Sequence, residues 1–375
     1  MRKIHSRRLL MKILRSLLFI WVIFWAPFLG NEIQSATYER EYRQLVWFYK
    51  PSFDTTPRIL AKYFENFILT KGDESYRDIL KAEGVTSPFL QYLRLDAIQD
   101  PGSCSVEPYH NQVADMPGDF CNISSNHPDW FLLDKNGRRM YSDGYVMMDP
   151  GNSDWRRFFL NRAMLSQTAL NWDGVFLDNA EASLTKRYQY GQVPAKYKTD
   201  SSYQNAVKGL LSYLYINYFQ PAGHPLFANI ITLKNPSIWF SFLQVLDGAM
   251  SESWGTDWDS KWLPAAEWRQ QLNRAENTQG LGKRVILVAQ GDKTDLQRQQ
   301  FAYASFLLID NGRAFFRYTL KDHYRHAWKY ENYNHNLGIP LGRRYQKGNQ
   351  WCRDYSSGKV CVDPSSHNSV ILTKQ

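Results

Sequence analysis

Short apolar runs alternate with longer amphipathic segments along most of the chain. A run that is apolar at successive positions is typical of a strand covered on both faces, as in a parallel sheet. The runs that predict strands are residues 45–49, 67–69, 89–95, 174–178, 226–230, 247–251, 284–289 and 313–318. The segments that predict helices are residues 57–64, 74–83, 154–170, 203–219, 237–246, 264–279 and 297–308. This alternation predicts an α/β fold with a parallel sheet.

Eight strands separated by helical segments predict a closed (β/α)8 TIM barrel, which we place at residues 37–336. The chain has 375 residues, enough for a barrel of about 250 residues with insertions. A doubly wound open sheet is the alternative. It is less favoured because no G-x-G-x-x-G motif follows the first predicted strand.

Two regions interrupt the alternation. Residues 96–150 are rich in glycine and proline and predict a long loop insertion after the third strand, with a hairpin whose polar turn is Asp134 to Gly137. The tail, residues 337–375, predicts a small β extension in which 351–355 and 359–362 form a hairpin.

The N-terminal segment, residues 1–35, combines a basic start with an apolar run from Leu17 to Leu29. It predicts a signal peptide, with an uncleaved membrane anchor as the alternative. The formal net charge is +9, but six basic residues and no acidic residue lie within the first thirty positions. Elsewhere no Lys/Arg cluster suggests a phosphate-binding stripe, so a nucleic acid is not an expected partner.

The four cysteines form two pairs that are local in sequence, Cys104 with Cys121 and Cys352 with Cys361. In an exported protein this pattern favours two disulfides, while four free buried thiols are the alternative. The expected location is therefore secreted, periplasmic or associated with the cell envelope. No spacing of His and Cys indicates zinc, and we expect neither a metal nor an organic cofactor.

Two carboxylates follow predicted strands. Asp178 ends the fourth strand and Glu252 ends the sixth, which is where barrels place their chemistry. Glycoside hydrolysis needs one carboxylate that is ionised and another group that holds a proton. The alternatives are that Asp178 only caps the next helix and that Glu252 is a surface-loop residue. Glu181 is given a supporting or capping role.

Aromatic residues make up 15% of the chain, which favours a sugar ligand although many must be core residues. Aromatic residues in predicted strand-end loops could stack on sugar rings, and barrel-rim packing is their other interpretation: Trp47, Tyr49, Trp130, Trp254 and Trp258. Polar residues near predicted strand ends or in the insertion could bind sugar hydroxyls: Arg94, His127, Asp149, Asn179, Asn229 and Gln290. Trp254 could also help to keep Glu252 protonated by excluding water.

The stretch WDGVFLDN, with MDPGNSDW upstream and a later strand ending in Ser-Glu, resembles the hypothetical glycosyl hydrolase barrels. NHPDWFLLDKNGR and the tail pattern NLGIPLGRR…RDYSSGKVCVDPSS fit the same group, over residues 43–365. The resemblance to α-galactosidase and α-amylase barrels is more distant. It implies that Asp178 is the nucleophile or base and that Glu252 is the acid.

We therefore predict an exported glycoside hydrolase that acts on a poly- or oligosaccharide. A non-catalytic carbohydrate-binding barrel of the cell envelope is the alternative, and carboxylates far apart would favour it. A nucleotide-dependent transferase is disfavoured because the phosphate-binding loop is missing.

Overall fold

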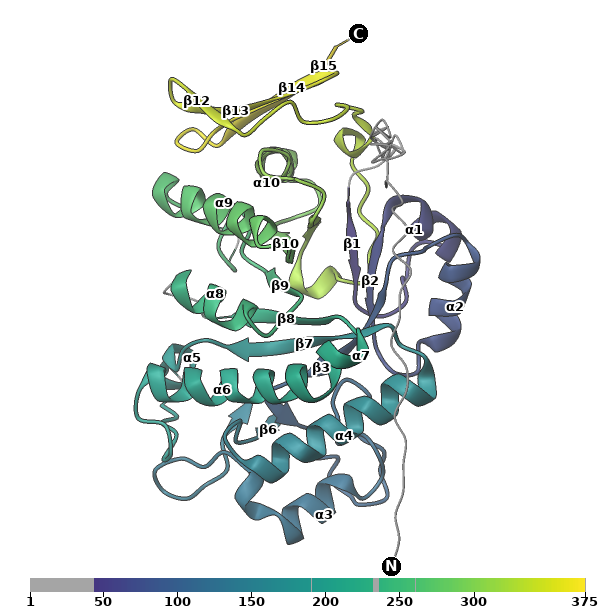
Figure 1. Ribbon diagram of the computed structural model, residues 1–375, viewed down its shortest axis with the longest axis vertical. Coiled ribbons are helices and arrows are strands. Elements are labelled where there is room, and N and C mark those ends of the chain that lie inside the picture. The colour runs from purple at the N-terminus through teal and green to yellow at the C-terminus, as the bar shows by residue number, and fades with distance from the viewer. Residues whose placement is uncertain (1–43, 190, 232–235, 260, 375) are drawn as a thin grey trace, which may run out of the picture. The chain divides into compact units, whose positions relative to one another are not determined.

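A parallel barrel forms the body of the computed structural model, which describes residues 44–189, 191–231, 236–259 and 261–374 (Figure 1). Its eight strands, in the order in which they pair, are β1 (Val46–Phe48), β2 (Asn66–Leu69), β3 (Phe89–Arg94), β7 (Gly174–Glu181), β8 (Leu226–Ile231), β9 (Gly248–Ser251), β10 (Arg284–Gln290) and β11 (Ala314–Thr319). A parallel bridge between Leu45 and Phe316 joins the first strand to the last. The sequence-based prediction of a (β/α)8 barrel is confirmed, and the open doubly wound sheet is excluded.

The predicted signal or anchor, residues 1–35, lies outside the described residues. Within the described part of the chain, the helices are all too short or too polar to cross a bilayer.

Helices connect successive strands and cover the outside of the barrel (Figure 1). They are α1 (Pro57–Tyr63), α2 (Glu74–Ala82), α4 (Ser153–Leu170), α6 (Asp200–Leu214), α8 (Pro236–Leu243), α9 (Ala265–Gly280) and α10 (Leu296–Leu307). A π-helical turn at Tyr215–Phe219 and the short α7 (Gln220–Ala222) extend α6, and α5 (Thr185–Gln189) precedes it. The strand β11 is followed by the 3-10 turns η3 (Lys321–His323) and η4 (Glu331–Asn334), so the helical partner of the last strand is replaced by the tail.

Local sequence explains where the longest helix begins and ends. The Asn152 side chain accepts hydrogen bonds from the backbone N–H groups of Asp154 and Trp155, at 2.9 and 3.0 Å, and so caps the start of α4. The helix ends at Asn171, which adopts a left-handed conformation with φ of 57°. The strand that carries Asp178 follows directly, so the cap and the end of α4 determine where that strand starts.

Apolar residues fill the inside of the barrel and leave polar side chains at one end. The interior cluster comprises Val46, Phe48, Ile68, Leu90, Phe176, Phe227, Met250, Ile286, Val288 and Phe315. Gly248 is required by this packing, since a Cβ at that position would lie 2.5 Å from the Phe227 ring. The barrel is therefore a packed core rather than a channel, and a ligand can reach it only at its ends.

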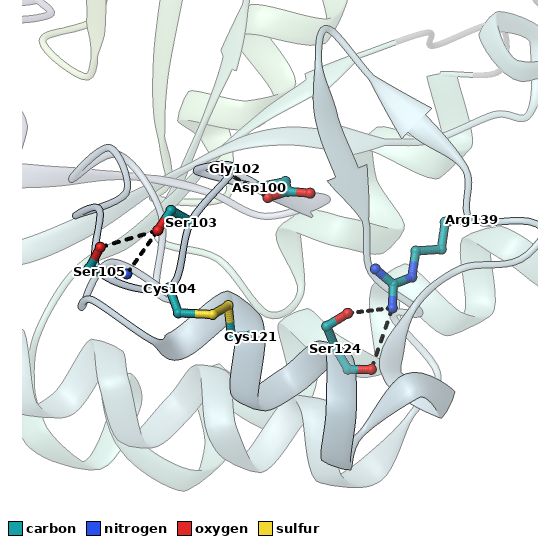
Figure 2. The surroundings of a disulfide bond; sticks show 8 residues. All are labelled: Asp100, Gly102, Ser103, Cys104, Ser105, Cys121, Ser124 and Arg139. Carbon is teal, nitrogen blue, oxygen red and sulfur yellow. Dashed lines mark hydrogen bonds between the residues drawn. A yellow bond between two sulfur atoms is a disulfide. The ribbon is translucent and has the colours of Figure 1, made fainter.

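The insertion after the third strand is structured rather than an open loop. It contains β4 (Ala97–Ile98), α3 (Asp119–Asn126), the 3-10 turn η1 (Pro128–Trp130), β5 (Tyr141–Ser142) and β6 (Tyr145–Met147), with β6 paired between β4 and β5. Figure 2 shows the disulfide that links Cys104 in its first loop to Cys121 on α3, with Cα atoms 5.7 Å apart. Arg139 donates to Ser124 Oγ at 2.7 Å and ties the predicted turn region to the same helix.

The tail forms a four-stranded antiparallel sheet, two strands larger than the predicted hairpin. Its strands are β12 (Tyr345–Lys347), β13 (Gln350–Tyr355), β14 (Gly358–Asp363) and β15 (Asn368–Thr373). Cys352 and Cys361 are directly opposite each other in this sheet and form the second disulfide. The sheet packs on α10 (Figure 1), where Arg353 donates to the Asp310 carbonyl at 2.7 Å. The domain boundary at residue 337 stays a prediction.

Candidate active site

Strand periodicity directs several polar side chains to the same end of the barrel. Alternate residues of a strand point to the same face, so a residue two positions after an interior residue also points inward. Phe176, Phe227 and Met250 belong to the barrel interior. The residues two positions after them are Asp178, Asn229 and Glu252. By the same rule Tyr92 follows Leu90 and Gln290 follows Val288.

Asn229 bridges the two carboxylates. Its Nδ2 donates to Asp178 Oδ1 at 2.9 Å and to Glu252 Oε2 at 2.5 Å. The two oxygens therefore lie no farther apart than the sum of these two distances. The structure thus brings together the two carboxylates that the sequence singled out, at one end of one barrel.

Asp178 lies in an irregular part of its strand. The pairing of β7 with β8 shifts register between Leu177 and Ala180, and Asn179 adopts a left-handed φ of 60°. Asparagine tolerates this conformation better than most residues. The shift turns the Asn179 N–H back to Asp178 Oδ1, at 2.8 Å. Bulges of this kind often re-aim a side chain beside an active site.

Every hydrogen-bond partner found for Asp178 is a donor. The Tyr92 hydroxyl donates to Oδ2, while Asn229 and the Asn179 backbone both donate to Oδ1. An ionised carboxylate can only accept hydrogen bonds, so this arrangement suits its charged form.

Glu252 lies in a different environment at the barrel mouth, where its side chain is partly buried. Burial, followed by the nearby Asp178 carboxylate, raises the pKa of Glu252 from 4.5 to about 7. Hydrogen bonds from Asn229 and from the Tyr324 hydroxyl, the latter at 3.0 Å, act in the opposite direction. A carboxyl group with such a pKa can hold a proton near neutral pH and give it to a leaving group.

Tyr324 reaches Glu252 from beyond the last barrel strand, and two residues hold it. Gln290 Nε2 donates to the Tyr324 hydroxyl at 3.3 Å. Arg317 on β11 donates to the Tyr324 carbonyl at 2.7 Å and to the His326 carbonyl at 3.2 Å. Burial raises the pKa of the Tyr324 hydroxyl well above its usual value, so it remains a neutral donor.

Tyr49, at the end of β1, belongs to the same site. Its ring stacks on Tyr92 with 5.2 Å between centroids, and its side chain is only partly buried. Burial, followed by the charge of Asp178, raises the pKa of Tyr49. A partly exposed tyrosine beside the carboxylates fits the predicted role in binding a sugar, which stays a prediction.

A buried ion network supports the Asp178 side of the site. Arg187 pairs with Glu181, with Nε 3.1 Å from Oε2, and its Nη2 lies 3.6 Å from Asp96. Asp96 also accepts from Arg94 at 2.8 Å and from Asn179 Nδ2 at 3.4 Å. Glu181 therefore supports the site through an ion pair rather than as a helix cap.

Three predicted ligands of the sugar hydroxyls are enclosed by protein. Arg94 is buried and donates to Asp96 and, at 2.9 Å, to Ser142 Oγ. Asn229 and Gln290 are buried as well, and their amides donate to the carboxylates and to Tyr324. These side chains contact other residues of the site, and their role in binding a sugar stays a prediction.

Two of the predicted stacking tryptophans are core residues. Trp47 lies between the inward-facing Val46 and Phe48, so its ring points outward and packs on Phe64, 5.3 Å away. Trp254 donates from Nε1 to the Ala302 carbonyl at 3.0 Å. Both side chains are fully buried. They offer no ring face to a sugar.

His127, Trp130 and Asp149 contact other residues of the loops. His127 stacks on Trp130 at 4.1 Å, and Trp130 itself is buried. Asp149 accepts from Lys196 at 2.6 Å and from the Tyr197 hydroxyl, and so holds two loops together. Of the predicted aromatic residues, Trp258 is the exposed one, with 44% of its surface accessible.

Sequence reasoning missed Tyr92 and Tyr324. Tyr92 could have been found from its position two residues after Leu90, within a predicted strand. Tyr324 lies in an irregular segment after the last strand, where no periodic pattern indicates its direction.

A model of hypothetical glycosyl hydrolase family 15 matches residues 102–359. The match includes Asp178, Asn229, Glu252 and Tyr324. Among curated proteins, none matches this sequence.

Solved structures with a similar fold are glycoside hydrolases. The glycoside hydrolase domain of PelA from Pseudomonas aeruginosa is 14% identical, with a TM-score of 0.51 over 76% of this chain and 97% of that one. An α-amylase from Malbranchea cinnamomea is 7% identical, with a TM-score of 0.50 over 87% and 85%. The galactosidase domain of the α-galactosidase-sucrose kinase AgaSK is 11% identical, with a TM-score of 0.44 over 89% and 47%. At these identities the resemblance concerns the fold.

Proposed function

The chain belongs to hypothetical glycosyl hydrolase family 15, and from this membership and the geometry of the site we propose that it hydrolyses O-glycosidic bonds of a poly- or oligosaccharide with Asp178 and Glu252. The observation that carries the proposal is the shared donor Asn229, which holds both carboxylates at one barrel mouth. Their closeness argues against the alternative of a non-catalytic sugar-binding barrel.

The surroundings of the two carboxylates assign them different roles. Both carboxylates accept hydrogen bonds from their neighbours. Burial and the Asp178 charge raise the pKa of Glu252 to about 7, so we assign Glu252 as the acid and Asp178 as the ionised carboxylate. One carboxyl group that holds a proton, beside a second that is ionised, is the usual arrangement for this chemistry.

The short separation favours a retaining mechanism. The upper limit set by the two Asn229 hydrogen bonds excludes the ~6.5–9.5 Å separation of inverting enzymes and is compatible with the ~5–5.5 Å of retaining ones. Asp178 attacks the anomeric carbon as the bond to the leaving oxygen breaks, and the proton of Glu252 passes to that oxygen. Water then bonds to the anomeric carbon, gives a proton to Glu252 and releases Asp178.

Hydrolysis of a panel of glycans by Asp178→Asn and Glu252→Gln tests this proposal. We expect each variant to lose at least about a thousandfold in kcat on the glycan that the native protein cleaves. On an aryl glycoside with a good leaving group, the first step needs little help from an acid. Glu252→Gln should therefore recover part of the rate of that step, and Asp178→Asn should not. Glu267→Gln, an exposed carboxylate of α9, is the control. Full activity in both active-site variants would sink the proposal.

Export is part of the proposed function. The two disulfides fit an oxidising compartment, and residues 1–35 have the composition of a signal or an anchor. Fractionation of cells that make the full chain, with N-terminal sequencing of the product, tests export and cleavage. A reduced, uncleaved protein in the cytoplasm would contradict it.

A further inference from the structure

Exposed aromatic side chains are concentrated on the face of the barrel that holds the carboxylates. In the described part of the chain, the exposed aromatic residues are Phe53, Tyr109, Tyr141, Tyr188, Trp258 and Tyr345. All but Tyr345 lie in segments that follow the C-terminal end of a barrel strand: after β1, β3, β7 and β9. These are the segments that surround the mouth of a TIM barrel.

Exposed aliphatic residues are spread more widely over the surface. Ile59, Ile79, Leu165 and Leu296 lie on α1, α2, α4 and α10, which cover the outside of the barrel. Single exposed aliphatic residues are normal on a protein surface. Val106 and Met116 in the insertion after β3 are exposed as well. The observation that indicates a binding function at the mouth is therefore the position of five exposed aromatic residues after barrel strands.

Two of the exposed tyrosines are fixed on the Asp178 side of the mouth. Arg187 donates from Nη1 to the Tyr141 carbonyl at 3.1 Å. Tyr188 directly follows Arg187 in the sequence. The same guanidinium pairs with the buried Glu181 and approaches Asp96, which accepts from Asn179. Tyr141 and Tyr188 are thus connected to Asp178 through a rigid, buried network.

Phe53 and Trp258 belong to the Glu252 side. The segment that carries Trp258 is attached by Thr256 Oγ1, which donates to the Gln290 carbonyl at 3.3 Å. The Phe53 backbone N–H donates to the Arg325 carbonyl at 3.0 Å, and the Arg325 guanidinium covers one face of the Phe53 ring at 3.5 Å. Gln290 donates a hydrogen bond to Tyr324, and Tyr324 donates one to Glu252. Tyr324 is also the sequence neighbour of Arg325.

We infer that the ligand of this mouth is a polysaccharide chain that lies across it and is cleaved internally. Flat aromatic faces stack well on the C–H faces of sugar rings, and two such groups here lie on opposite sides of the carboxylate pair. A chain held by Tyr141 and Tyr188 at one end and by Phe53 and Trp258 at the other would place an internal bond over the carboxylates. This inference rests on the proposed hydrolase function and adds the substrate class and the mode of attack.

A binding assay separates this inference from catalysis. The full chain carrying Glu252→Gln is run in native gels that contain hydroxyethyl cellulose, soluble starch, galactomannan, arabinogalactan or chitosan. We expect at least one polymer to retard it. Adding Tyr141→Ala, Tyr188→Ala and Trp258→Ala should weaken that retardation by at least tenfold in Kd. Tyr345→Ala, which removes the exposed aromatic residue of the tail, is the matched control and should change nothing.

A second measurement uses the active chain on the polymer that it cleaves. Internal cleavage predicts that viscosity falls early, before many reducing ends have formed. The triple variant should lose at least tenfold in kcat/KM on the polymer and less than threefold on an aryl glycoside. Its thermal unfolding should match that of the native protein, because the three side chains are exposed.

The results that would overturn this inference differ from those that would overturn the hydrolase proposal. If none of the five polymers retards the Glu252→Gln chain, or if the triple variant is retarded as strongly as its parent, the inference is wrong. Release of single terminal sugars without early loss of viscosity would also overturn it. Failure of the hydrolase proposal shows instead as unchanged activity in Asp178→Asn and Glu252→Gln.

Discussion

Tyr324 donates a hydrogen bond of 3.0 Å to Glu252, although the tyrosine lies beyond the last barrel strand and the glutamate follows the sixth. A donor to the ionised form of a carboxyl group lowers its pKa, and Tyr324 does so for Glu252. Burial and the charge of Asp178 outweigh this effect. The segment that follows β11 therefore tunes the proposed acid of the barrel.

Removing this hydroxyl should move the pH dependence of catalysis. The proposed acid must be protonated, so activity is lost as pH rises through the pKa of Glu252, about 7. In Tyr324→Phe that pKa rises, and the alkaline limb of kcat/KM moves to higher pH. We expect less than about a tenfold change in kcat at the optimum. An unmoved limb, measured from pH 5 to 9, would contradict the role of Tyr324.

Glu252 should make the protein less stable at alkaline pH. Its pKa in the folded protein, about 7, lies above the usual value of 4.5 for glutamate. The folded state therefore holds this proton more tightly, and the resulting stability is complete below pH 4.5 and lost as pH rises through 7. Glu252→Gln removes the cost of burying an ionised carboxylate at this position. We expect the unfolding free energy at pH 8 to rise by on the order of 1–3 kcal/mol. At pH 4 we expect no gain, and Glu267→Gln should show none at either pH.

Replacing Asn229 should affect both carboxylates at once. Asn229→Ala removes the donor that Asp178 and Glu252 share, so neither remains fixed relative to the other. We expect kcat to fall by about a hundredfold, as for other preorganised donors. The Asn229 Oδ1 atom has no hydrogen-bond partner in the described structure, so the melting temperature should change by only a few degrees. A fall in kcat of less than twofold would contradict the bridging role.

The buried pair of Arg187 and Glu181 should be costly to break and less costly to replace. Both side chains are almost fully buried. Arg187→Met leaves Glu181 without its main partner and should cost about 3–5 kcal/mol in urea unfolding. The double variant Arg187→Met with Glu181→Met should recover part of that loss. If the single variant costs less than about 1 kcal/mol, the network does not stabilise the mouth as we describe.

The disulfide shown in Figure 2 should contribute to stability more than to activity. It joins residues 17 positions apart, for which chain entropy predicts about 3 kcal/mol. Replacing Cys104 and Cys121 with serine should therefore lower the unfolding free energy by about 2–3 kcal/mol. Activity should stay within threefold, because Arg187 holds Tyr141 independently of it. Ser105→Ala, in the same exposed loop, is the control.

The sequence was sufficient to predict the barrel and its two strand-end carboxylates. The apolar runs around Phe176 and Met250 mark buried parallel strands, and a polar residue directly after such a run lies at the mouth. Asn229 was found by the same rule. Its bridging position could not be inferred, because it depends on the distance between neighbouring strands.

The sequence could not determine which way the aromatic residues point. Trp47 adjoins a predicted strand end just as Tyr49 does, but the alternation that turns Val46 and Phe48 inward turns Trp47 outward. Only the folded barrel shows which set of alternate residues faces the interior. The contact of Tyr324 with Glu252 depends on an irregular segment that crosses back over the mouth, and residue patterns do not indicate such a path.

The parallel bridge between Leu45 and Phe316, which closes the barrel, affects the order in which the barrel can form. The first barrel strand emerges from the ribosome long before the last, and the bridge that joins them cannot form until β11 has been made. Until then Phe48 and Phe315, which belong to one interior cluster, cannot share a core. Contacts between residues so distant in sequence form slowly and leave apolar surface open to aggregation. The interior side chains of β1 therefore stay uncovered by β11 until the chain beyond residue 319 has been made and has emerged.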